Sequence, residues 1–234
     1  MPAARTGTPV KEVGPLLAAA APETRARLVA QSRPLVLPRG ATVFAQDAPA
    51  DHLHLLLQGS VGLSTMEEGG GATLVEILGP GDAFVVGAVM LRLPSPVSAA
   101  TLAPSRIVAI PAEQMRAEAL GDPGLMQAAL EQMSRQWRLL VDQVVDLKTR
   151  DATQRAARFL ARRLPSPRGA VELPEPRAAI AARLGMTPES LSRALHGLEA
   201  AGLLRLQGRR VDVPDRAALL RLALPRTEHR ARPA

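Results

Sequence analysis

The spacing of hydrophobic residues changes along the chain, and each spacing predicts a different element. Residues 15–32 carry an apolar pattern that predicts a short helix. Short apolar runs such as HLHLLLQGSVGLS and RIVAIP then follow, separated by clusters of Gly, Pro, Asp and Ser, with EEGGG at 67–71 as a flexible hairpin tip. The runs recur roughly every eight to twelve residues, which is typical of a β-sandwich or jelly roll. The sequence therefore predicts a β-roll domain over residues 15–121.

A second period begins after Pro111. Apolar residues recur there at alternating spacings of four and three, which predicts a long helix over residues 122–150 with one apolar seam. The seam consists of Met126, Leu130, Met133, Trp137, Leu140, Val144 and Leu147. One seam needs a partner, which is either part of the β-roll or the same helix of a second copy. We expect the second arrangement, a homodimer, because palindromic DNA is read by two-fold symmetric proteins.

A helix-turn-helix is predicted over residues 177–196, RAAIAARLGMTPESLSRALH. Ala181 falls where the two helices touch, and Gly185 falls where the turn needs a left-handed residue. Thr187 is placed to cap the second helix. LLRLQGRRVDV then reads as a short β-hairpin that turns near Gly208. We therefore expect a winged helix over residues 151–224, beginning with a helix over 151–164, although the bare pattern also fits an ordinary helical hairpin.

The outward side of the second helix carries polar side chains that can address base edges and phosphates in a major groove. The candidate DNA-binding residues are Thr187, Glu189, Ser190, Ser192, Arg193 and His196 on this helix and Arg209 and Arg210 on the wing.

Charge is distributed unevenly between the two ends of the chain. Residues 149–234 contain 17 Lys and Arg against 8 Asp and Glu, whereas residues 1–148 contain 12 against 14. This excess favours a polyanionic partner for the C-terminal part, although an arginine-rich surface can also reflect a biased genome. No Tyr, one Trp and three Phe leave few rings on which unpaired bases could stack. Double-stranded DNA is therefore favoured over single strands.

Composition excludes several classes of protein. The chain has no Cys, which excludes disulfides, thiol redox sensing and a thiolate-bound iron–sulfur cluster. No segment approaches about 18 consecutive apolar residues and no apolar signal core is present, so we expect a cytoplasmic protein with no membrane partner. Four scattered His and no known catalytic motif predict that it is not an enzyme. We expect residues 1–14 and 225–234 to be disordered.

The predicted α+β order of β-roll (jelly-roll) sensor domain, long dimerisation helix and winged helix-turn-helix resembles the CRP/FNR superfamily of bacterial transcription regulators. RGATVFAQ followed by HLHLLLQGSVGL is similar to the family's opening hairpin, and GPGD is similar to its turn. The passage DLKTRDATQRAARFLARRL is similar to the family's transition from dimer helix to DNA-binding domain. The resemblance implies a homodimer that binds double-stranded DNA and works with RNA polymerase.

Within the second helix, Glu189, Ser192 and Arg193 match the E-x-x-S-R pattern of the FNR-like branch, and the surrounding residues resemble Dnr-, NnrR- and FtrB-type members. That branch reads half-sites resembling TTGAT. The resemblance implies that Arg193 addresses the guanine and that Glu189 and Ser192 address neighbouring bases. The competing interpretation is an architectural or regulatory-subunit protein without sequence-selective readout.

The sensor domain departs from the pattern of cyclic-nucleotide binders. In those relatives the loop after the GD turn supplies a Glu for the ribose and an Arg-Ser or Arg-Thr pair for the phosphate. This chain reads GDAFVVGAVMLRLPSPVSAATL, with Ser95 and Pro96 where that pair would stand. Because a bound phosphate needs a neighbouring cation and donor, cyclic AMP and cyclic GMP are disfavoured.

The sequence leaves the effector and any cofactor unknown. One alternative is a small apolar ligand held by an effector pocket of Val85, Val86 and Met90 with Arg92 nearby. Another is a gas- or redox-responsive cofactor, with His52 and His54 as candidate haem ligands. The favoured interpretation of these two histidines is that they are half-exposed strand residues opposite the buried Leu53, Leu55 and Leu57, and no metal site is predicted from them.

Overall fold

The computed structural model describes residues 14–66 and 72–224, which form two compact units that meet at residues 138 and 139. The boundary falls inside one helix, α5 (Pro123–Thr149). Among the described residues, no helix is long and apolar enough to span a membrane. The segments expected to be disordered, apart from Gly14, and the hairpin tip expected at 67–71 lie outside the described residues.

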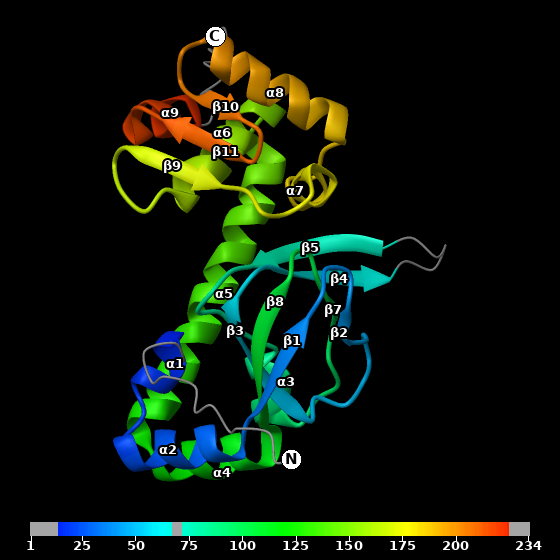
Figure 1. The fold of residues 1–234 in the computed structure, drawn as a ribbon, viewed down its shortest axis with the longest axis vertical. Helices are drawn as coiled ribbons and strands as arrows, with labels where there is room; N and C mark the ends of the chain where they lie inside the picture. Colours follow the sequence, from blue (N-terminus) through cyan, green and yellow to red (C-terminus); the bar gives the residue numbers. More distant parts are fainter. Residues whose placement is uncertain (1–13, 67–71, 225–234) are drawn as a thin grey trace, which may run out of the picture. The chain divides into compact units, whose positions relative to one another are not determined.

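The first unit contains two four-stranded antiparallel sheets with the orders β1-β8-β3-β6 and β2-β7-β4-β5 (Figure 1). Their strands are β1 (Arg33–Leu37), β2 (Thr42–Phe44), β3 (His52–Gln58), β4 (Val61–Met66), β5 (Ala72–Leu78), β6 (Ala83–Phe84), β7 (Ser98–Thr101) and β8 (Ser105–Pro111). Side chains alternate between the faces of a strand. On β3, Leu56 packs into the core between the sheets, whereas Leu53 and Leu55 pack against helices on the outer face. The predicted β-roll is confirmed.

Helices cover the outer face of the first sheet and complete a second core. They are α1 (Gly14–Ala18), α2 (Pro22–Gln31), α3 (Val86–Leu91), α4 (Ala112–Gly121) and the first half of α5. The single helix expected over 15–32 is wrong, because the chain breaks between α1 and α2. Asp122 accepts the backbone N–H of Ala21 at 2.8 Å and that of Leu125 at 3.0 Å. These donors lower the pKa of the Asp122 carboxyl, so its charge holds the break in place.

Residues 82–86, DAFVV, form one of the short apolar runs of the β-roll, but the run is a strand only at Ala83 and Phe84. Val85 has a left-handed backbone with φ of 55°, and the next residues enter α3. Arg92, at the other end of α3, has φ of 56°. A β-branched residue seldom adopts this conformation, so the pattern of apolar residues gave no sign of the turn at Val85.

The second unit contains the winged helix-turn-helix. Its elements after α5 are α6 (Ala152–Arg163), β9 (Gly169–Glu172), α7 (Arg177–Arg183), α8 (Pro188–Ala200), β10 (Arg205–Gln207), β11 (Arg210–Val213) and α9 (Arg216–Leu222). Asp151 caps α6 through a reciprocal capping box with Gln154. The sheet order is β10-β11-β9, so the predicted hairpin is confirmed and gains a third strand, β9, which was not predicted. Helix α9 was also not predicted.

Candidate nucleic-acid interface and sensor domain

The helix-turn-helix is built as its sequence predicts. Ala181 is fully buried where α7 meets α8, and Leu191 and Leu195 of α8 are buried beneath it. Gly185 lies in the turn with φ of 61°, and a Cβ there would lie 2.5 Å from Cδ2 of Leu147. The left-handed backbone therefore favours glycine here, and a Cβ would in addition require the Leu147 side chain to shift.

The first turn of α8 is capped by its own side chains. The Thr187 hydroxyl oxygen accepts the Ser190 backbone N–H at 3.2 Å, and Pro188 follows in the first turn. The pKa of the Glu189 carboxyl is lowered, first by a hydrogen bond from its own backbone N–H and then by the Thr187 hydroxyl. Glu189 is therefore ionised at neutral pH and can only accept hydrogen bonds, for example from a cytosine amino group.

Side chains further along α8 are preorganised on its outward side. Arg193 donates from Nη2 to the Ser190 hydroxyl oxygen at 3.3 Å. The Nδ1 atom of His196 lies 2.8 Å from the Ser192 carbonyl oxygen. Because a carbonyl only accepts, Nδ1 carries the proton and Nε2 faces outward as an acceptor in the neutral ring. The six predicted residues of α8 and its cap thus lie on one partly or fully exposed face.

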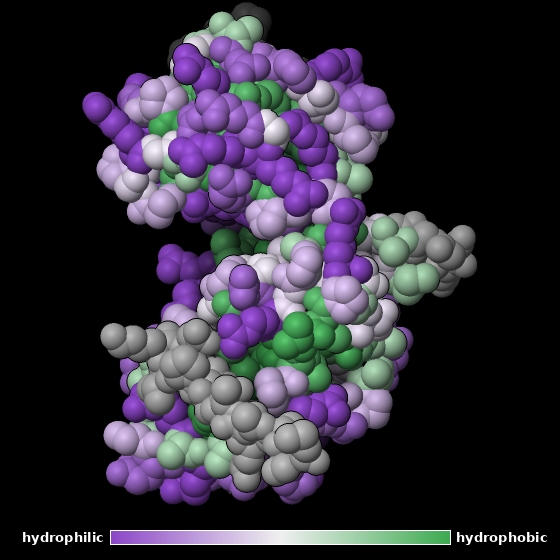
Figure 2. Space-filling model, viewed as in Figure 1, coloured by the Kyte–Doolittle hydropathy of each residue, from purple (hydrophilic) through white to green (hydrophobic). Residues whose placement is uncertain are grey.

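The two wing arginines differ in their surroundings. Gly208 has φ of 64° at the β10–β11 turn, and Arg209 follows it, exposed and without a salt bridge to the described residues. Arg210 donates from Nε to Asp212 at 2.9 Å and lies 4.0 Å from Glu172. Arg209 therefore presents its charge to solvent more fully than Arg210 does. Hydrophilic side chains cover most of the visible face of this unit in Figure 2.

Two acidic residues that the sequence analysis did not single out attach α5 to α6. Asp146 pairs with Arg150 and, at 3.2 Å, with Nε of Arg158. Asp142 pairs with Arg162 and, at 3.4 Å, with Arg158. Burial is the largest cause that lowers the pKa of Arg158, so this network is partly desolvated. The i,i+4 spacing of Asp146 and Arg150 was the available sequence signal for that one pair, whereas no local pattern indicates the pairs with Arg158 and Arg162.

The residues of the predicted seam on α5 fall into two groups. Met126 and Met133 pack partly against the core of the first unit. The other five are exposed in the single chain, and they are Leu130, Trp137, Leu140, Val144 and Leu147. Trp137 is 68% exposed, which is unusual for so large an apolar side chain. Five residues of the seam therefore form an exposed apolar stripe, and the two methionines pack within the chain.

The predicted effector-pocket residues lie in different surroundings. Val86 is fully buried in the core beside the helices, and Val85 and Met90 pack against the same core. Arg92 instead lines a cavity of about 510 Å³ together with charged residues that include Glu113. In this structure the three apolar side chains act as packing, and their role as a ligand pocket stays a prediction.

His54 is buried, which corrects the interpretation of it as half-exposed. It is 8% exposed, and its ring lies 5.3 Å from the rings of both Phe44 and Phe84. Burial, followed by the charge of His52, lowers the pKa of His54 to about 4. Its Nδ1 has no hydrogen-bond partner among the described residues. A haem would have to open this ring stack to reach His54, so haem ligation stays a hypothesis.

Two sequence profiles match the chain. The profile of the cyclic nucleotide-binding domain matches residues 34–120, and that of the Crp-like helix-turn-helix domain matches residues 154–222. The crystal structure of a protein from Ruegeria pomeroyi, assigned as cyclic nucleotide binding, has a TM-score of 0.65 and 30% sequence identity, covering 91% of this chain and 94% of that chain. The chain belongs to the CRP/FNR family of transcription regulators.

A curated relative and a further solved structure extend the comparison. The CRP-like cAMP-activated global transcriptional regulator of Mycobacterium tuberculosis is 29% identical over 208 residues, which are 86% of this chain and 93% of that protein. FixK2 from Bradyrhizobium japonicum shares the fold, with a TM-score of 0.73 and 23% identity over 82% of this chain and 98% of that chain. Because its relatives are transcription regulators, this chain is a DNA-binding regulator rather than an enzyme, as the sequence predicted.

Proposed function

We propose that this CRP/FNR regulator binds a TTGAT-like palindrome in the cytoplasm as a homodimer, in the manner of the FNR-like branch. The observation that carries the proposal is the outward face of α8. There an ionised Glu189, Ser192 and an Arg193 oriented by Ser190 stand on a capped helix. Arginine pairs bidentately with guanine and a carboxylate accepts from cytosine, which are the contacts such a half-site offers.

Replacement of Arg193 by Ala tests this assignment. We expect Arg193→Ala to cost about 1–3 kcal/mol on the palindrome and to relax preference at the guanine, because a bidentate base contact is lost. Arg209→Ala is the matched control, since it removes the same charge from the exposed wing turn and should weaken all duplexes alike. Fluorescence anisotropy on palindromic and random duplexes measures both. Equal losses on both duplexes for Arg193→Ala would favour the architectural alternative.

We further propose that the exposed stripe of α5 joins the two protomers. Its seam residues Leu130, Trp137, Leu140, Val144 and Leu147 are large, apolar and exposed, and heptad spacing suits a parallel two-stranded coil. A dimer of this kind would present two copies of α8 to successive major grooves. By family resemblance the bound dimer would act on RNA polymerase.

The effector is proposed not to be cyclic AMP, although the Mycobacterium tuberculosis relative is a cAMP-activated regulator. Ser95 is buried, and its backbone pairs with Asp47 and Ala48, while Pro96 has no N–H to donate. Neither Ser95 nor Pro96 supplies a cation for a phosphate at these positions, and an unpaired buried charge is costly. We expect calorimetry to show no tight binding of cyclic AMP and unchanged DNA affinity. Micromolar affinity that strengthens DNA binding would contradict this proposal.

A further inference from the structure

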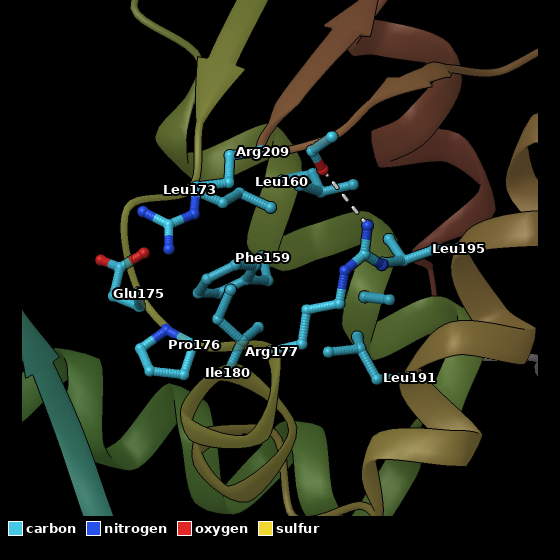
Figure 3. Close-up of a pocket in the computed structure, with 12 residues that line it drawn as sticks. Phe159, Leu160, Leu173, Glu175, Pro176, Arg177, Ile180, Leu191, Leu195 and Arg209 are labelled. Atoms are coloured by element: carbon cyan, nitrogen blue, oxygen red, sulfur yellow. Dashed lines mark hydrogen bonds between the residues drawn. The ribbon is translucent and has the colours of Figure 1, made fainter. Parts of the chain in front are cut away.

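The winged-helix unit contains a cavity of about 240 Å³ at the meeting point of α6, α7, α8 and the wing turn. Its walls are mostly apolar and include Leu160, Leu173 and Ile180. The ring of Phe159 projects into the middle of this space in Figure 3. Phe159 is only half-buried although it lines this mostly apolar space, so the packing here is incomplete. Concave apolar sites with a few polar groups are the usual form of small-ligand pockets.

The charged groups of the cavity leave it with a positive rim. Glu175, the acidic residue of the lining, is buried and accepts from Nη1 of Arg163 at 2.9 Å. The Arg163 guanidinium also stacks at 4.5 Å over the Phe159 ring. Arg177 and Arg209 stand on either side of the space in Figure 3. Since Glu175 is balanced by Arg163, the two remaining cations favour an anionic group at the rim.

Arg177 is held in place at this rim. Its Nη2 donates to the Gly208 carbonyl at 3.3 Å, drawn as the dashed line in Figure 3. The backbone N–H of Leu173 donates to the Arg209 carbonyl at 2.9 Å and fixes the wing turn on the opposite side. A guanidinium has five N–H donors, so one bond to a carbonyl leaves others for a carboxylate. The Arg177 guanidinium and the backbone of the wing turn are therefore held in place, and the guanidinium of Arg177 can meet a planar carboxylate through two donors.

The volume limits the apolar part of the ligand. An apolar cavity of about 150 Å³ is large enough for a benzene ring. The cavity of about 240 Å³ can therefore hold one aromatic ring with a small substituent. The Phe159 side chain provides a surface against which that ring can stack. From this geometry we infer that the winged-helix unit has a binding site for a small aromatic monocarboxylate, with its ring beside Phe159 and its carboxylate on Arg177 and Arg209.

The test is titration of the full chain with 4-fluorobenzoate, followed by calorimetry and by fluorine NMR. We expect saturable binding at one site per chain, and about tenfold weaker binding of the neutral isostere 4-fluorobenzamide because the charge-assisted bonds are lost. No saturable binding below about 10 mM, or equal affinity for the amide, would overturn the assignment.

Variants locate the site. Arg177→Gln and Arg209→Gln should each weaken 4-fluorobenzoate binding about tenfold, and both residues are exposed, so the fold should be kept. Arg205→Gln is the matched control. It removes the same charge from an exposed residue of the neighbouring strand, and Arg205 does not line the cavity. Ala156→Leu fills the cavity and should abolish binding, with the thermal unfolding midpoint as a check on folding. Unchanged affinity in both Gln variants, or equal losses in Arg205→Gln, would refute the site.

Discussion

The imidazole of His54 packs against the phenyl rings of Phe44 and Phe84, and its Nδ1 has no partner among the described residues, so protonation there would place a charge in an apolar core. Its pKa falls from 6.5 to about 4 on folding. In the unfolded chain His54 is therefore protonated below about pH 6.5, whereas in the folded chain it stays neutral down to about pH 4. Stability from this residue is complete above the unfolded pKa and is lost as the pH falls toward the folded one.

We expect acidification from about pH 7.5 to about pH 5 to lower the free energy of unfolding by on the order of 2 kcal/mol through His54 alone. Urea unfolding of the wild-type chain and of His54→Leu at both pH values measures this, and the variant should lack that part of the dependence. His196→Ala serves as the control, because His196 is exposed and should leave the dependence in place. The same dependence in His54→Leu would show that other groups cause it.

Among single residues, the ones that could be predicted are those fixed by local geometry. Gly185 and Thr187 have roles set by a turn and a helix start only a few residues long. The burial of His54 could not be predicted, because its ring neighbours Phe44 and Phe84 come from strands distant in sequence. Alternation along β3 placed His52 and His54 on one face but left open whether that face was inside.

Among the helices and strands, α5 could be predicted from the sequence only in part. Its heptad spacing predicted one long helix, yet the spacing could not tell that Met126 and Met133 pack within the chain while Leu140 stays exposed. Short elements were missed for another reason. Strand β9 follows a Pro- and Ser-rich segment, and its pairing with β11 depends on long-range contacts that no local pattern records. Helix α3 is only six residues long and begins after the left-handed Val85.

Leu140→Asp tests the stripe on α5. Leu140 is 39% exposed in the single chain, and in the proposed dimer an aspartate there would be buried against its symmetry mate at a cost of several kcal/mol. We expect light scattering to show monomers at concentrations where the wild-type chain is dimeric. Leu139→Asp is the matched control, since Leu139 is 42% exposed and lies one residue off the seam. A Leu140→Asp dimer would remove the seam as the interface.

For the whole molecule, the proposed dimer makes a prediction about DNA geometry. Two reading helices fixed by one dimer helix should need half-sites whose centres are about one helical turn apart. Inserting about five base pairs turns one half-site to the far side of the duplex, so affinity should fall to that for random DNA. Inserting the same number into a random duplex is the control. Gel-shift titration that shows unchanged affinity for the altered palindrome would indicate independent monomers.

The internal ion pairs of the winged-helix unit reduce the contribution of its arginines to the salt dependence of DNA binding. At least six of its arginines already face carboxylates, and these are Arg150, Arg158, Arg162, Arg163, Arg210 and Arg221. A side chain neutralised in this way displaces few counterions when a duplex arrives. The logarithm of affinity should therefore fall with the logarithm of salt concentration less steeply than 17 basic residues suggest. Binding would then stay strong over a wider range of ionic strength than the composition implies.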